Sequence, residues 1–211
     1  MEDASDKTAT ERLQAIQTEL SGLARKNNRA PDDITLIAVS KTHGAETITP
    51  VLEAGHRVFG ENRVQEAAGK WPALRRVYTD VQLHLIGALQ SNKAADAVGL
   101  FDVIHSLDRP KLAAALARAM AESGRKPRLF VQVNTGNEPQ KAGVPVADVA
   151  GFVGDCRTQH GLSIEGLMCL PPRGDAAGPH FALLGKLAAS LDLACLSMGM
   201  SADYRAAVSL G

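Results

Sequence analysis

The stretch Ile34-Thr-Leu-Ile-Ala-Val-Ser-Lys41 decides the fold prediction. Its residues are mostly apolar and β-branched, they run straight into a lysine, and turn-prone residues stand on both sides. A short continuous apolar run of this kind indicates a strand that is buried on both faces, as in a parallel sheet. Because side chains alternate along a strand, Lys41 shares a face with Val39 and lies at the carboxyl end.

A lysine at this place has a specific chemical use. Ligands of α/β folds bind at the carboxyl ends of parallel strands. Partial desolvation there disfavours the ammonium form, so we expect Lys41 to be available as a neutral amine. A neutral amine can attack an aldehyde and hold it as a Schiff base. The alternative is a lysine that simply ends a strand and extends into water.

Composition excludes several classes of protein. The chain has 211 residues, 45% of them hydrophobic, with 23 basic and 23 acidic side chains. This length fits one domain, which we expect to span residues 1–211. The net charge of zero argues against binding to nucleic acid or to a membrane surface. The acidic N-terminus has no apolar signal region and no run is long enough to span a membrane, so we expect a soluble cytoplasmic protein.

The sequence offers no metal or nucleotide motif. Its cysteines, Cys156, Cys169 and Cys195, are far apart and form no C-x-x-C pair, so we expect reduced, buried thiols that serve packing. The histidines have no spacing that is typical of zinc ligands. No phosphate-binding loop, dinucleotide fingerprint or nucleophile elbow is present.

Strand and helix patterns alternate along the whole chain. After an opening helix capped by Thr8, with Glu11 at capping-box spacing, the expected strands lie at 34–41, 57–60, 84–87, 103–107, 129–134, 164–170 and 194–198. The expected helices between and after them lie at 46–53, around Trp71, and at 110–123, 146–160, 181–191 and 202–210, with Asp108 capping the helix that follows it. Alternation with short links predicts a (β/α)8 TIM-like barrel with an extra N-terminal helix, whose last strand is missing from the chain.

Several motifs, in order, resemble one known family. They occupy 38–42 (AVSKT), 59–66 (FGENRVQE), 84–93 (HLIGALQSNK), 131–134 (VQVN) with 140–143 (QKAG), 166–168 (GLM) with 171–172 (PP), and 196–203 (LSMGMSAD). This series, which spans nearly the whole chain, resembles the pyridoxal phosphate homeostasis protein family, which is related to the N-terminal barrel of alanine racemase. The resemblance implies that Lys41 carries pyridoxal phosphate as a Schiff base.

A phosphate group also needs an anion site. Ser201 is expected to be the N-cap of the final helix, where backbone N–H groups and the positive helix end attract anions. The alternative is a serine that only caps its own helix. The resemblance favours a phosphate contact at Ser201, with Gly199 and Met200 shaping the same pocket. It also implies a further strand, with an arginine and a glycine-rich turn, beyond the last residue, Gly211; we expect that this part was cut away or is undescribed.

The remaining candidates carry alternatives. The amide of Asn62, after a strand end, can hydrogen-bond the cofactor ring or form a local turn. Met168 belongs either to the core or to the cofactor face. His84 is expected to be a packed histidine, and Lys141 a solvated loop lysine.

These residues favour a carrier over an enzyme. A racemase needs a second base on the other face of the cofactor, and the tyrosines, Tyr78 and Tyr204, lie on helical segments rather than at strand ends. We therefore expect a monomeric protein that binds pyridoxal phosphate and delivers it transiently to pyridoxal phosphate-dependent apoenzymes. The alternatives are a low-activity racemase or decarboxylase that uses this cofactor, and a cofactor-free lyase whose lysine forms a Schiff base with its substrate.

Overall fold

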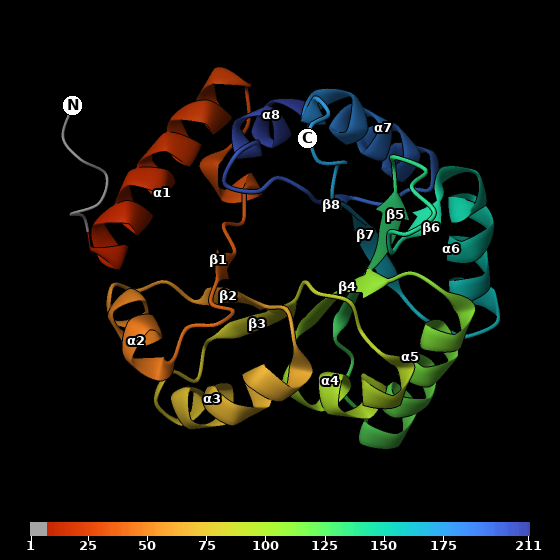
Figure 1. The fold of residues 1–211 in the computed structure, drawn as a ribbon, viewed down its shortest axis with the longest axis horizontal. Helices are drawn as coiled ribbons and strands as arrows, with labels where there is room; N and C mark the ends of the chain where they lie inside the picture. The colour runs from red at the N-terminus through yellow and green to blue at the C-terminus, as the bar shows by residue number, and fades with distance from the viewer. Residues whose placement is uncertain (1–7) are drawn as a thin grey trace.

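The strands form one curled parallel sheet with helices around it (Figure 1). The computed structural model describes residues 8–211. Its strands are β1 (Ala38–Val39), β2 (Val58–Glu61), β3 (Gln82–Leu85), β4 (Val103–Leu107), β5 (Arg128–Asn134), β6 (Val144–Pro145), β7 (Ile164–Cys169) and β8 (Cys195–Ser197). Its α-helices are α1 (Ala9–Lys26), α2 (Ala45–Glu53), α3 (Val64–Val77), α4 (Ala94–Leu100), α5 (Pro110–Ser123), α6 (Val149–Thr158), α7 (Ala177–Ser190) and α8 (Tyr204–Leu210). Short 3-10 turns cover Pro31–Asp33, Ser91–Lys93 and Val146–Asp148.

The sheet follows the order of the chain. Its path is β1-β2-β3-β4-β5-β7-β8, every pairing is parallel, and β6 pairs only with β5. All seven predicted strands are therefore present and the barrel-like α/β fold is confirmed. Within the described residues β1 and β8 do not pair, so the barrel wall is open between them. In Figure 1 the helices form the outer ring, and α1 and α8 lie outside this opening.

The first strand differs from its prediction. The stretch 34–41 was expected to be one strand buried on both faces, but only Ala38 and Val39 pair, and they pair with β2 alone. Val39 is 44% exposed. The reason is position, because a strand at the edge of a sheet lacks the second neighbour that would cover it. An apolar run does not distinguish an edge strand from a central one.

The core lies between the sheet and its helices. Its largest fully buried side chains include Trp71 of α3, Phe59 of β2, Phe101 and Phe181. Burying an aromatic side chain contributes about 2–3 kcal/mol relative to leaving it exposed. The aromatic residues, few in this sequence, are therefore concentrated where they stabilise the fold most.

The helix ends match the predictions in part. Thr8 and Glu11 form the expected capping box at the start of α1. The expected cap at Asp108 is wrong, because α5 begins at Pro110 with Arg109 as its N-cap. Proline fixes its own φ for the first helical position, and this places the boundary one residue later. The strand predicted at 84–87 is found at Gln82–Leu85, and the helix predicted at 181–191 begins earlier, at Ala177. No helix of the described chain is long and apolar enough to cross a membrane.

Candidate functional site

Lys41 lies just beyond the carboxyl end of β1. The last backbone bond that joins this segment to the sheet runs from the Ser40 N–H to the Gly60 carbonyl at 2.9 Å. The chain then turns through Lys41, whose side chain is exposed. The predicted partial desolvation of Lys41 is therefore wrong, because its strand lies at the sheet edge. Access to the amine, rather than burial, characterises this site.

A set of charged side chains from α3 binds the backbone of this turn. The ammonium group of Lys70 donates to the carbonyls of Ser40 and His43 at 2.8 and 2.9 Å. The Thr42 N–H donates to Glu66 Oε1 at 2.5 Å, and Lys70 Nζ lies 3.0 Å from the same oxygen. Thr42 itself has φ +65°. A β-branched residue rarely adopts this conformation, and it needs support from its surroundings.

Glu61 connects this turn to the core. Its side chain is fully buried, and its Oε1 accepts hydrogen bonds from Ser40 Oγ at 2.5 Å and from Trp71 Nε1 at 3.0 Å. Lys70 Nζ lies 2.9 Å from the same oxygen. A buried carboxylate needs such partners, and within residues 8–211 only Oε1 of Glu61 has them, because its Oε2 is buried without a hydrogen bond. The turn that carries Lys41 therefore rests on a buried ionic cluster.

The loop after β8 differs from its prediction. The last helix was expected to start at 202 with Ser201 as N-cap, but α8 begins at Tyr204 and Ser201 lies in the preceding turn, exposed. The Met200 N–H donates to the Asp203 carboxylate at 2.5 Å. The turn thus closes through an aspartate two residues beyond the predicted cap, because that side chain reaches back to the loop backbone.

Gly199 fits closely against α8. Its φ is +89°, and a side-chain carbon at this position would lie 2.8 Å from the Cβ of Ala207. Glycine is therefore required both by the backbone conformation and by the space. The group that approaches Gly199 is the final helix of the chain, and a role of this glycine in the pocket for a phosphate stays a prediction.

Asn62 lies directly after β2 and is half-buried. Its backbone packs against Gly87, which follows β3, so closely that a side-chain carbon at 87 would overlap it. Parallel strands end at one edge of the sheet, so Asn62, Lys41 and the loop 199–201 all follow strand ends on the same side. The structure brings these candidates to one face of the barrel. A ring contact of the Asn62 amide stays a prediction.

Met168 lies deeper than the other candidates. It is 3% exposed and packs with Val103 and Phe130. Of the two interpretations that the sequence left open, core packing is the one the structure supports.

A chain of polar side chains, formed by His84, His105 and Ser197, lies beside Phe130. His84 Nδ1 lies 2.9 Å from His105 Nε2, and His105 Nδ1 lies 2.8 Å from Ser197 Oγ. The ring of His105 also stacks on Phe130. Burial lowers the pKa of His84 to about 4 and that of His105 to about 3. Both rings are therefore neutral at pH 7, and the prediction of a packed His84 is confirmed.

The other predicted polar residues have structural surroundings. Lys141, expected to be a solvated loop lysine, pairs with Glu138 at 2.5 Å and is half-buried. The cysteines are free, as expected, and Cys156 and Cys169 are buried, but Cys195 is only half-buried. Burial raises the pKa of Cys156 to about 11 and that of Cys169 to about 12. No group of side chains among residues 8–211 could hold a metal ion.

Sequence reasoning missed the support of the turn. Glu61, Glu66 and Lys70 were not singled out, although two of them belong to the motif at 59–66. Their helical spacing was a usable signal, since Glu66 and Lys70 stand at i and i+4 at the start of a helix. The His105–Ser197 pair had no such signal, because these residues are 92 positions apart.

The fold and the exposed lysine at its carboxyl edge define the class of the protein. The family described as alanine racemase, N-terminal domain, matches residues 12–209. The barrel carries the exposed amine of Lys41 on a turn that Lys70 and Glu66 of α3 hold by hydrogen bonds. The class is therefore that of barrels built like the N-terminal domain of alanine racemase.

Within this class, the chain belongs to the pyridoxal phosphate homeostasis protein family. It is 34% identical to the pyridoxal phosphate homeostasis protein of Pseudomonas aeruginosa, over 97% of this chain and 90% of that protein. It is 32% identical to the protein of the same name from Vibrio alginolyticus, over 94% of this chain and 90% of that protein. The PipY structure of Synechococcus elongatus with PLP bound is 41% identical, with a TM-score of 0.79, and the match covers 91% of this chain and 93% of that one.

Proposed function

We propose that this protein holds pyridoxal phosphate through a Schiff base to Lys41 and takes part in the homeostasis of this cofactor. The observation that carries the proposal is the exposed amine at the carboxyl edge of a parallel sheet, on a turn that α3 supports. The names of the relatives and the PLP-bound PipY structure support the choice of ligand.

The residues of the chain fit the reactive end of this ligand. Pyridoxal phosphate, when bound, supplies an aldehyde that condenses reversibly with a primary amine. Lys41 would supply the amine nitrogen of the C=N bond, and the aldehyde oxygen would leave as water with the two protons of the neutral amine. The Lys41 side chain is exposed, so water would have access to this nitrogen and could hydrolyse the bond. An accessible lysine therefore suits a protein that must both hold and release the cofactor.

The loop after β8 fits the phosphate. The Met200 N–H already binds an anionic oxygen, that of Asp203, at 2.5 Å. The exposed hydroxyl of Ser201 follows directly in the chain. We assign Ser201 and the backbone around Gly199 and Met200 to the phosphate, which would have to replace the Asp203 carboxylate at the Met200 N–H.

The surroundings of the tyrosines support a carrier without strong catalytic activity. The Tyr204 hydroxyl donates to Glu19 Oε2 at 2.7 Å, and Tyr78 ends α3 with Arg57 over its ring. The Tyr204 hydroxyl is thus engaged by Glu19, and the Tyr78 ring lies against Arg57. The proposal includes a monomer in the cytoplasm that passes the cofactor to apoenzymes. The free thiols fit a reducing compartment.

Borohydride reduction followed by mass spectrometry tests the proposal. Reduction of the protein with pyridoxal phosphate should fix a pyridoxyl group on Lys41. The variant Lys41→Ala should lose this label and its visible colour, whereas Lys141→Ala, which removes the paired loop lysine, should keep both. Labelling of Lys41→Ala to the same extent as the wild type would refute the assignment of the lysine. A wild-type protein that stays colourless with the cofactor would instead favour the cofactor-free lyase.

Isotope exchange separates the carrier from an enzyme. Amino acids incubated with the loaded protein in heavy water should keep their α-hydrogen. Exchange at about 1 per second or faster, an ordinary enzymatic rate, would overturn the carrier and favour the racemase.

A further inference from the structure

Lys70 is a buried ammonium group whose hydrogen-bonding capacity is fully used. Its side chain is 10% exposed, and its Nζ lies within 3.0 Å of four oxygens. Two are the carbonyls of Ser40 and His43, which flank Lys41 in the chain, and two are the carboxylate oxygens of Glu61 and Glu66. An ammonium group has three protons, so Lys70 has none left for another partner.

The backbone that Lys70 binds is strained. Thr42 has φ +65°, a conformation that a β-branched residue rarely adopts. This conformation directs the Thr42 N–H to Glu66 Oε1 at 2.5 Å. Such strain persists only where the surroundings impose it. Here Lys70 holds the turn through its carbonyl groups, and Glu66 holds it through the Thr42 N–H.

We propose that Lys70 and Glu66 are positioning residues for Lys41: they fix the turn 40–43 so that the lysine amine meets the aldehyde of a bound ligand. The ligand part of this inference rests on the proposed function. The β1 ladder alone cannot fix this turn, because it is short and pairs on one side only. The bonds from α3 therefore determine where the Lys41 backbone lies.

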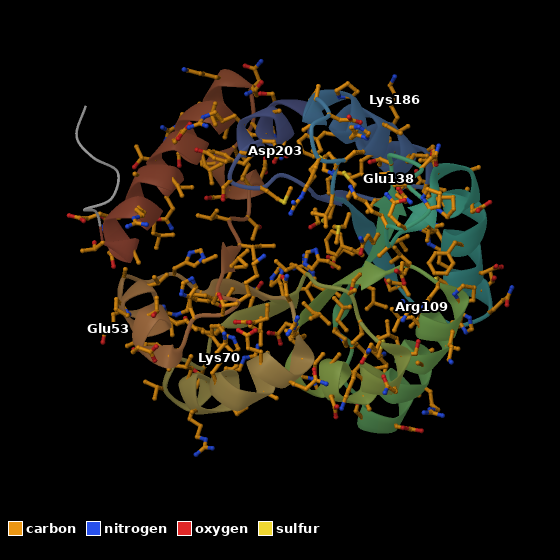
Figure 2. All side chains as sticks on the ribbon, viewed as in Figure 1. Glu53, Lys70, Arg109, Glu138, Lys186 and Asp203 are labelled. Atoms are coloured by element: carbon orange, nitrogen blue, oxygen red, sulfur yellow. The ribbon has the colours of Figure 1, made fainter. Side chains whose placement is uncertain are left out.

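The first test needs no cofactor. Hydrogen exchange of the Thr42 amide is measured in the wild type, in Lys70→Met and in Glu66→Ala. Both variants should exchange at least about tenfold faster, since each removes a hydrogen bond to a charged group. Glu66→Gln keeps an oxygen acceptor and should restore most of the protection. Lys186→Met removes an exposed lysine of α7, on the other side of the molecule, and should exchange like the wild type (Figure 2).

The second test separates positioning from general damage. Affinity is measured for pyridoxal phosphate and for pyridoxine 5′-phosphate, which lacks the aldehyde and cannot react with an amine. Glu66→Ala and Lys70→Met should lower the affinity for pyridoxal phosphate by about tenfold. Their affinity for pyridoxine 5′-phosphate should equal that of the wild type. If Lys70→Met fails to fold because Glu61 loses its partner, the double variant Lys70→Met with Glu61→Gln removes the unpaired charge.

The outcomes divide clearly. Unchanged Thr42 exchange in both variants, or equal weakening of both ligands, would overturn the positioning role. If the wild type binds both ligands equally well, the proposed function fails, and the exchange data still decide whether α3 fixes the turn.

Discussion

Acid should destabilise this protein at mildly acidic pH through two of its buried histidines, His84 and His105. His84 and His105 are 3% and 2% exposed and lie in hydrogen-bond contact. Burial lowers their pKa from 6.5 to about 4 and about 3, respectively. As the pH falls below 6.5, the unfolded chain binds a proton on each ring, whereas the folded protein does not. Stability therefore falls with pH in this range and stops falling, for each ring, below its folded pKa.

The expected loss follows from the pKa difference. Between pH 6.5 and pH 5, protonation of each ring stabilises the unfolded state relative to the folded state by about 1.36 kcal/mol per pH unit. This amounts to about 2 kcal/mol per histidine. Both rings together should lower the free energy of unfolding by about 4 kcal/mol between pH 7 and pH 5. Glu66 contributes below this range, because the hydrogen bond from Lys70 lowers its pKa from 4.5.

Urea unfolding at pH 7 and pH 5, followed by the fluorescence of the single tryptophan, measures this loss. A double variant, His84→Leu with His105→Phe, should lose far less stability at pH 5 than the wild type. The control His160→Gln, in the turn directly after α6, should behave like the wild type. Equal pH dependence of the double variant and the wild type would refute the reasoning. So would a ring of His84 or His105 that titrates near pH 6.5 by NMR, a measurement that needs no variant.

Three further predictions concern packing. Trp71→Phe, which removes a buried ring and its N–H donor, should lower the free energy of unfolding by about 2–4 kcal/mol in urea titrations. Gly166→Ala places a methyl group against the Cys195 carbonyl between β7 and β8, and should lower the melting temperature by at least about 4 °C. Gly87→Ala should displace Asn62 and weaken binding of pyridoxine phosphate in a titration, while a cofactor affinity equal to that of the wild type would show that Asn62 makes no contact.

The periodicity of the sequence predicted the order of the fold better than its edges. The seven alternating units correctly predicted a barrel-like α/β fold, because strands that alternate with helices through short links pair in parallel. The run at 34–41 failed as a buried strand, since whether a strand has one neighbour or two depends on the closure of the sheet. The prediction of Ser201 as the N-cap of the last helix was wrong for a local reason. The carboxylate of Asp203, rather than the serine hydroxyl, accepts the hydrogen bond from the loop N–H.

The candidate site was predictable where it depended on neighbouring residues. Lys41 at a strand end follows from a single segment, and the structure places it there. The support of the turn by Lys70 does not follow from a single segment, because Lys70 binds backbone carbonyl groups about 30 positions away. Every residue has a backbone carbonyl, so the sequence does not indicate which ones act as acceptors. The exposure of Lys41 was also hidden, since it follows from the open side of the barrel.

Because β1 pairs with β2 alone, it can open locally on a different timescale from the unfolding of the whole barrel. Opening an edge segment breaks few hydrogen bonds and leaves the remaining strands paired, so it costs much less free energy than unfolding the barrel. Lys41 follows this segment, so we expect local opening to limit the residence time of the ligand that we propose for it. Stabilising substitutions in the core far from α3 should therefore change the residence time of a ligand at Lys41 less than substitutions in the turn 40–43 do.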